Sequence, residues 1–145
     1  MAYGMRRGVE LRGAVPLDAA DIARLLRQPE DEMAGRLEAI AQDPHSALMV
    51  AADYGPVVGV AALHWHPVLH ATRSVARIST LVVAEEERHR GIGRMLLKAA
   101  SQAARQAGCD SLEWRVADEA SRGFCAATGF TEAGHGFVRA LRKRN

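Results

Sequence analysis

The junction around residue 85 constrains the fold of this chain more than any other stretch of the sequence. A β-rich apolar run, SVARISTLVVA at residues 74–84, leads through a short basic segment with two glycines into an amphipathic segment. From Ile92 onward the apolar residues recur at helical spacing, and Gly108 is well placed to end the helix. A strand, a glycine turn and a long helix in this order predict an α/β fold.

The remaining segments predict further strands and helices around this junction. A short apolar alternation at residues 7–15 predicts a first strand, and Asp18 or Asp21 can cap the helix that follows it. Two helices are expected next, divided by Pro29 and closed by Pro44. The other expected elements are a strand pair at 46–55 and 57–66, a strand at 111–116, a helix at 119–128 and a last β segment at 130–141. At 145 residues the chain fits one domain, 1–145, with a mixed sheet covered by helices.

Composition excludes several classes of protein. The formal net charge is +2, and the last seven residues hold four of the 19 basic ones, so the charge elsewhere is nearly balanced and does not favour a nucleic-acid-binding protein. The two cysteines, Cys109 and Cys125, have no spacing typical of a disulfide framework or a zinc site. No stretch is apolar enough for a signal peptide or a transmembrane helix. We therefore expect a cytoplasmic protein with neither nucleic acid nor membrane as a partner.

The glycine junction has the chemistry of an anion site. The first N–H groups of a helix have no partner within the helix and lie at the positive end of its dipole. Gly91 and Gly93 allow a phosphate to approach these amides, and Arg88, His89, Arg90 and Arg94 add positive charge. The alternative is a plain connecting loop whose arginines are neutralised by the glutamates at 85–87. Neither a P-loop nor a dinucleotide fingerprint matches, because no Lys-Ser or Lys-Thr follows and Leu96 replaces the third glycine.

Two motifs resemble one known family. The stretch LVVAEEERHRGIGRMLL at residues 81–97 is similar to the acetyl-CoA motif of the GNAT N-acetyltransferases, whose core is Arg/Gln-x-x-Gly-x-Gly/Ala, here residues 88–93. About 30 residues further on, FCAATGF at 124–130 resembles the family's Phe-Tyr-x-x-x-Gly-Phe. The resemblance spans nearly the whole chain. It implies a single-domain GNAT fold, with a mixed, mostly antiparallel central sheet that contains a splayed strand pair and is flanked by helices.

The resemblance also implies which residues hold acetyl-CoA. Backbone groups of the splayed strand hydrogen-bond the pantetheine arm, amides of the loop and first helical turn bind the diphosphate, and Asp118 occupies a position that is often asparagine in the family. The N–H of Val83 is the expected donor to the thioester oxygen. The implied cofactor contacts are Leu81, Val82, Val83, Arg88, His89, Arg90, Gly91, Ile92, Gly93, Arg94, Asp118 and Cys125.

The sequence departs from the family at the general acid. Many members have a tyrosine where this chain has Cys125, and a thiol is a shorter proton donor. Cys125 is therefore either a catalytic acid or a small apolar helix residue near the cofactor. This departure also motivates an alternative function, a catalytically weakened domain that binds acetyl-CoA or CoA in regulation or interaction.

Histidines of HWHPVLH supply candidates for the base. His64 and His66 lie on one face of their strand, since side chains alternate along it, and either can act as a base or bind the substrate. A half-buried structural histidine is the other reading. No metal is expected, because no carboxylate or cysteine is near in sequence and the reaction needs none. Further polar strand residues near the expected cleft are Arg77, Ser79 and Glu113.

The resulting hypothesis is an acetyl-CoA-dependent N-acetyltransferase. The acetyl group would move to a primary amine of a small molecule or a protein by direct attack in a ternary complex. Holding the two reactants in the right orientation is expected to contribute the largest share of the rate, about 7–11 kcal/mol. A homodimer is implied by the resemblance.

Overall fold

A computed structural model describes residues 2–6 and 8–142, with side chains from residue 8 onward. Its internal contacts divide the chain into two compact units, which meet between Arg115 and Val116. The first unit contains the sheet and three helices, and the second contains one helix and the C-terminal segment. No helix in the described part of the chain is both long and apolar enough to cross a membrane.

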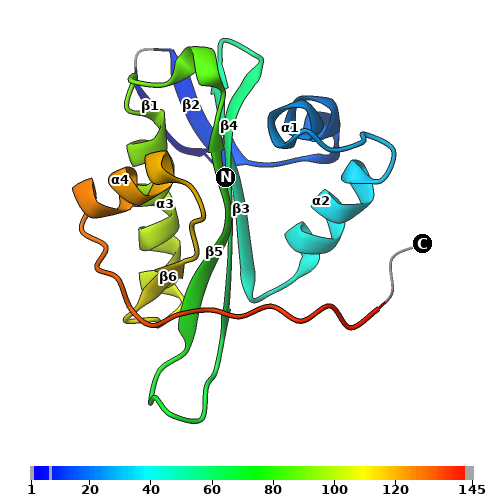
Figure 1. Cartoon of the computed structure of the whole chain (residues 1–145). Helices are drawn as coiled ribbons and strands as arrows, with labels where there is room; N and C mark the ends of the chain where they lie inside the picture. Colours follow the sequence, from blue (N-terminus) through cyan, green and yellow to red (C-terminus); the bar gives the residue numbers. More distant parts are fainter. Residues whose placement is uncertain (1, 7, 143–145) are drawn as a thin grey trace. The chain divides into compact units, whose positions relative to one another are not determined.

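The described strands of the first unit form one sheet in the order β1-β2-β3-β4-β5-β6 (Figure 1). All neighbours are antiparallel except β5 and β6, which are parallel. The predicted mixed, mostly antiparallel sheet is therefore confirmed. The first predicted strand is β2, but the sequence analysis missed β1, which pairs with it along the sheet edge. The strands are β1 (Ala2–Arg6), β2 (Val9–Gly13), β3 (Ser46–Asp53), β4 (Val57–His66), β5 (Val75–Val83) and β6 (Leu112–Trp114).

Helices cover both faces of this sheet (Figure 1). The predicted helices before and after Pro29 are α1 (Ala19–Leu26) and α2 (Met33–Gln42), and their buried residues pack with Val50 and Val60. The junction helix is α3 (Ile92–Gln106), on the opposite face, where a side chain at Gly59 would lie 3.0 Å from Leu96. Alternate residues of β4 therefore contact different helices. Short 3-10 turns, η1 (Pro16–Asp18) and η2 (Glu85–Glu87), precede α1 and α3.

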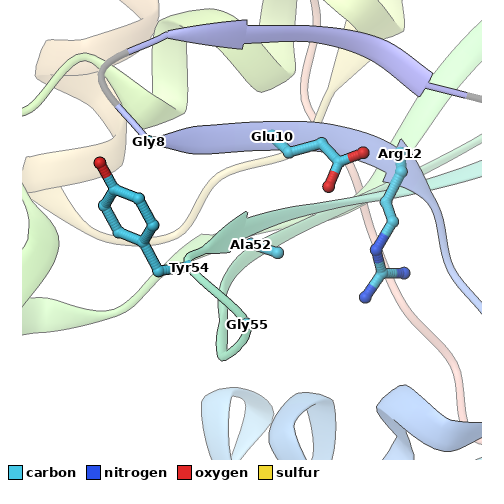
Figure 2. A pocket seen from close by; sticks show the side chains of 6 residues that line it. All are labelled: Gly8, Glu10, Arg12, Ala52, Tyr54 and Gly55. Carbon is cyan, nitrogen blue, oxygen red and sulfur yellow. The ribbon is translucent and has the colours of Figure 1, made fainter.

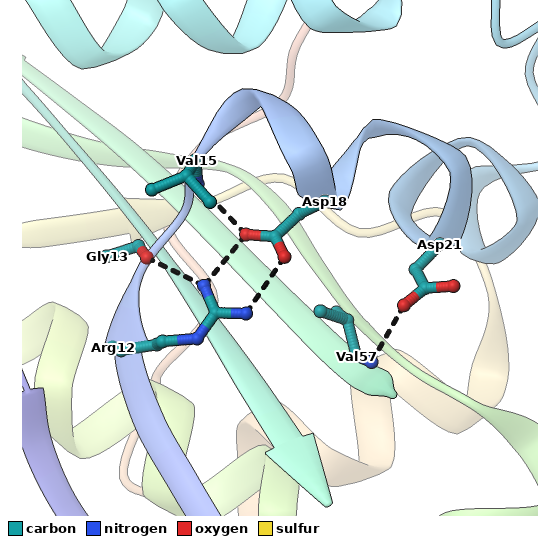
Figure 3. Close-up of polar contacts among 6 residues, drawn as sticks. All are labelled: Arg12, Gly13, Val15, Asp18, Asp21 and Val57. Atoms are coloured by element: carbon teal, nitrogen blue, oxygen red, sulfur yellow. Dashed lines mark hydrogen bonds and ion pairs between the residues drawn. The ribbon is translucent and has the colours of Figure 1, made fainter. Parts of the chain in front are cut away.

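A charged network joins β2 to the start of α1 (Figure 3). The two terminal nitrogens of the Arg12 guanidinium donate to Asp18, at 2.8 and 2.9 Å, and the N–H of Val15 donates to the same carboxylate at 2.9 Å. The carboxylate of Asp21 instead accepts the first N–H of β4, from Val57, at 3.0 Å. Asp18 is the N-cap residue of α1, as predicted, but its carboxylate accepts no hydrogen bond from the backbone of that helix.

The second unit contains α4 (Glu119–Ala127), close to the predicted helix at 119–128. The predicted last β segment at 130–141 is wrong, since no residue described between 130 and 142 lies in a strand. The N–H of Phe130 donates to Cys125 at the end of α4, and Gly134 has a φ of 67°, which interrupts an extended run. Alternation of apolar residues predicted a strand here, but this pattern does not show whether another strand is available to pair with the segment.

Candidate active site

A β-bulge divides β5 into two halves. Ala62 pairs with Thr80 and the next residue of β4, Leu63, pairs with Ile78, so Ser79 is the extra residue. Before the bulge, residues 76–78 pair with β6 on the other side. In the part of the chain that the structure describes, β6 pairs with none of the residues after it. The second half of β5 thus has a strand on one side only, as expected for the splayed pair.

The backbone direction of this second half follows from the hydrogen bond after it. The N–H of Ala84 donates to the carbonyl of Val58 at 2.8 Å, so it faces β4. Because backbone groups alternate sides along a strand, those of Val82 also face β4, and those of Leu81 and Val83 face away from it. These are two of the residues predicted to bind pantetheine through their main chains.

The bulge selects these two residues. Before it, the N–H of Ala76 donates to Ser111 on the β6 side, so a regular strand would next direct Thr80 and Val82 to that side. The extra residue at Ser79 shifts the alternation by one position, and Leu81 and Val83 take their place. A bulge at this point therefore both ends the pairing with β6 and selects which backbone groups lie exposed at the edge.

The loop before α3 has the geometry of an anion site. His89 and Gly91 both have left-handed backbones, with φ of 73° and 78°. Loops of this kind direct successive N–H groups into one hollow. No side chain caps the N-terminus of α3, which begins at Ile92 directly after the loop, so its first amides carry the positive end of the helix dipole.

The basic residues of the loop divide into two kinds. Arg90 donates to Asp53 at the end of β3, at 2.8 Å, and also to Glu87. These two hydrogen bonds raise its pKa above the ordinary arginine value. Its guanidinium therefore holds the loop in place. Arg88 and Arg94 are exposed and take part in no ion pair among the described residues.

A row of polar side chains crosses the sheet beside the bulge. Ser46, His64, Arg77 and Glu113 are register partners on four neighbouring strands, so they share one face. This is the face of Val60, covered further along by α1 and α2. Arg77 donates to Glu113 at 3.1 Å, where β5 and β6 still pair.

His64 occupies the centre of this row. One ring nitrogen lies 2.7 Å from Ser46 Oγ and the other 2.7 Å from Ser79 Oγ. His66, the second predicted candidate, is exposed at the end of β4. The sequence analysis missed Ser46, because pairing of a serine with a histidine 18 residues away depends on a strand register that a single sequence does not reveal.

Two predicted site residues belong to the second unit. Asp118 caps α4 by accepting the N–H of Ser121 at 2.8 Å and its hydroxyl at 3.1 Å. Cys125 is half-buried on the same helix, and burial raises the pKa of its thiol. The thiol therefore stays protonated to a higher pH than a free cysteine.

A hollow in the first unit is lined by none of the predicted site residues (Figure 2). It has a volume of about 230 Å³ at the β2–β3 end of the sheet. Tyr54 covers Gly8 there, since a side chain at Gly8 would lie 2.3 Å from the ring. The predicted binding groups are instead a strand edge and a helix terminus, which need no enclosed cavity. The hollow is lined by Gly8, Glu10, Arg12, Ala52, Tyr54 and Gly55.

Comparison with known proteins agrees with this geometry. Residues 18–130 match the model of the acetyltransferase (GNAT) family. The aminoalkylphosphonate N-acetyltransferase of Salmonella typhimurium is 32% identical over 140 residues, which cover 91% of each chain. A putative acetyltransferase from Agrobacterium tumefaciens superposes with a TM-score of 0.80 at 29% identity, over 90% of this chain and 99% of that one. An aminoglycoside N-acetyltransferase in complex with CoA shares the fold, with a TM-score of 0.81 at 22% identity over 97% and 100% of the two chains.

The chain belongs to the GNAT acetyltransferase family. It is an acetyl-CoA-dependent N-acetyltransferase, and the predicted family and donor are confirmed. The outward backbone groups of Leu81 and Val83 fit the amides of a pantetheine arm, much as an added strand would. The uncapped start of α3 fits a diphosphate.

Proposed function

We propose that residues 1–145 act as one N-acetyltransferase domain, which acetylates the primary amine of a small molecule by direct attack in a ternary complex. The observation that carries this proposal is the second half of β5, which among the described strands pairs with β4 alone, so that two residues face outward near an uncapped helix start. Acetyl-CoA, when bound, supplies the activated acetyl group. The residues proposed to hold it are those predicted above.

The N–H groups of Val83 and Leu81 are the donors proposed for the thioester carbonyl. Both face away from β4, and neither has a strand opposite in the described chain. The thioester stands at the end of the arm remote from the diphosphate. Leu81 lies farther along β5 from α3 than Val83 does. Its N–H is therefore a second possible donor, nearer the bulge.

An aminoalkylphosphonate is the acceptor class we propose. The relative that acts on this class is 32% identical across 91% of both chains. A phosphonate needs a cationic partner, and Arg77 lies on the same face as His64, half exposed and paired only with Glu113 among the described ion pairs. A bound phosphonate could replace Glu113 as the ion-pair partner of Arg77, so the guanidinium of Arg77 would stay paired.

The donor site is tested by ligand-induced stabilisation. Acetyl-CoA at 100 times its Kd should stabilise the protein by about 2.7 kcal/mol, seen as a higher Tm. Gly91→Val should abolish this rise. Gly108→Val is the matched control, because its φ of 89° imposes similar strain of about 2 kcal/mol at the other end of α3. A wild-type Tm that does not respond to acetyl-CoA would contradict the proposal.

The acceptor is tested by comparing a short aminoalkylphosphonate with the matched amino alcohol, a polyamine and an aminoglycoside. We expect the highest kcat/KM with the phosphonate, and Arg77→Gln should raise its KM about tenfold with little effect on the amino alcohol. Equal rates with the phosphonate and the amino alcohol would rule out this acceptor class.

Two further proposals concern the state of the protein in the cell. The free thiols of Cys109 and Cys125 support a cytoplasmic location. A homodimer, implied by the family, is tested by the mass of the protein in solution.

A further inference from the structure

Four side chains form one continuous hydrogen-bonded chain across the sheet. Ser46 Oγ donates to Asp43, 2.7 Å away in the loop before β3. The same oxygen lies 2.7 Å from His64 Nδ1, and His64 Nε2 lies 2.7 Å from Ser79 Oγ. The chain thus runs from a carboxylate to the hydroxyl at the bulge of β5.

The number of available protons fixes the direction of every bond. A serine hydroxyl has one proton, and Ser46 gives it to the carboxylate of Asp43. The nitrogen Nδ1 of His64 must therefore carry a proton and donate it to Ser46 Oγ. In a neutral imidazole Nε2 is then an acceptor, and it receives the hydroxyl proton of Ser79. The carbonyl of Ala62, 3.5 Å from Ser79 Oγ, is too distant to compete.

The outer end of this chain lies beside the proposed thioester site. Ser79 is exposed, and it precedes Leu81, whose N–H faces away from β4, by two residues. Two residues of strand correspond to about 7 Å. An amine in contact with Ser79 Oγ is therefore within a small molecule's length of a carbonyl held by Leu81.

A carboxylate stands at the inner end of this chain of hydrogen bonds. The carboxyl of Asp43 has a lowered pKa, because it accepts hydrogen bonds from Ser46 and from the N–H of His45. It is therefore an anion at neutral pH, so it can only accept the hydrogen bond from Ser46. The other charged or titratable groups that face this position are His45 in the same loop, His66 on β4, Arg77 on β5 and Glu113 on β6.

We propose that Ser79 is a catalytic residue that takes the proton of the attacking amine and passes its own to His64, with Ser46 and Asp43 as positioning residues. This proposal rests on the proposed acetyl transfer. The amine nitrogen forms a bond to the acetyl carbon, and the carbon–sulfur bond breaks with its electron pair on sulfur. The amine proton moves to Ser79 Oγ as the Ser79 hydroxyl proton moves to His64 Nε2. His64 then releases that proton to water, and the CoA thiolate takes one up from water.

The first test needs neither substrate nor activity. Long-range proton–nitrogen NMR of the histidine-labelled, ligand-free protein should show His64 as the Nδ1–H tautomer at neutral pH. In Ser46→Ala the Nδ1 proton loses its acceptor, and the tautomer preference should weaken or reverse. A wild-type His64 in the Nε2–H tautomer would overturn the proposed direction of transfer.

The second test separates proton transfer from structural support. His64→Gln should lower kcat by about 10²–10⁴-fold and remove the fall of the rate at acidic pH. The KM for acetyl-CoA, and the rise in Tm that acetyl-CoA causes, should stay unchanged. Ser79→Ala should lower kcat less, and Ser79→Thr, which restores a hydroxyl, should recover most of it. His70→Gln, at an exposed loop histidine, is the matched control.

The outcomes distinguish this proposal from the function on which it rests. A kcat for both His64→Gln and Ser79→Ala within a few fold of wild type, with the acidic fall retained, would overturn the relay and leave the acetyltransferase assignment intact. Acetylated Ser79 in the mass spectrum of enzyme treated with acetyl-CoA alone would make Ser79 a nucleophile and also overturn it. Absence of turnover in the wild-type protein with every amine would contradict the proposed function instead.

Discussion

Two regions of the first unit differ in whether their polar groups have hydrogen-bond partners within the protein. In the closed region, where β2 meets η1, Arg12 and Asp18 satisfy one another and the N–H of Val15. In the open region, the second half of β5 and the first turn of α3, main-chain groups have neither a strand nor a cap opposite them among the described residues. Groups in the closed region are satisfied within the protein, whereas those of the open region remain available to hydrogen-bond a ligand.

The largest expected effect lies in the closed region. Asp18→Ala leaves the guanidinium of Arg12, 27% exposed, without its carboxylate and should lower the free energy of unfolding by about 3 kcal/mol at pH 7. The hydrogen bond from Arg12 lowers the pKa of Asp18, so its contribution is present above the unfolded pKa of about 3.9 and lost as the pH falls through the lower folded value. Urea unfolding of both proteins at several pH values checks this.

The matched control is Glu32→Ala, which removes an exposed ion pair with Arg36 and should cost about 0.5 kcal/mol or less. In Asp18→Ala the affinity for acetyl-CoA should not change. A large loss of that affinity in protein that is still folded would show that the two regions are coupled.

The open region is tested by two neighbouring prolines. Proline has no N–H, so Val83→Pro removes an outward donor and should lower kcat/KM about 100-fold with little loss of stability. Val82→Pro removes an N–H that faces β4, and it should instead lower the free energy of unfolding by about 2–3 kcal/mol. Kinetics and urea unfolding of both variants check this difference. Equal effects of the two would contradict the alternation deduced from Ala84.

The smallest effect concerns a side chain outside both regions. Burial raises the pKa of the Cys125 thiol, so less of it is thiolate at a given pH. Alkylation of Cys125 by iodoacetamide at pH 8 should therefore be several-fold slower than that of a free cysteine peptide. Tryptic mass spectrometry across pH measures this rate, and reaction as fast as that of the peptide would show that the thiol is not perturbed.

Periodicity predicted those parts of the fold whose signal is local. The helix from Ile92, the hairpin of β3 and β4 and the strand β5 follow from the spacing of apolar residues and from Gly108. The failures concern pairing between segments. β1 was missed, and residues 130–141 were wrongly predicted as a strand. A strand is stable only when it pairs with another strand, and the spacing of apolar residues does not show which segments pair.

The site divides in the same way. The motif at residues 88–93 directed attention to the loop and helix start, which have the expected geometry. The tie of Arg90 to Asp53 and the link between His64 and Ser46 depend on the register and the path of the chain. A single sequence contains neither, so the side-chain partners became visible only in three dimensions.

The contacts of Arg90 have a consequence for ligand capture. They fasten the loop before α3 to the end of β3 and to η2 through the protein's own side chains. A loop that is already ordered loses little conformational entropy when acetyl-CoA binds, so more of the interaction energy remains as affinity. Association should then consist of a single docking step, without a slower ordering of the loop after the first encounter.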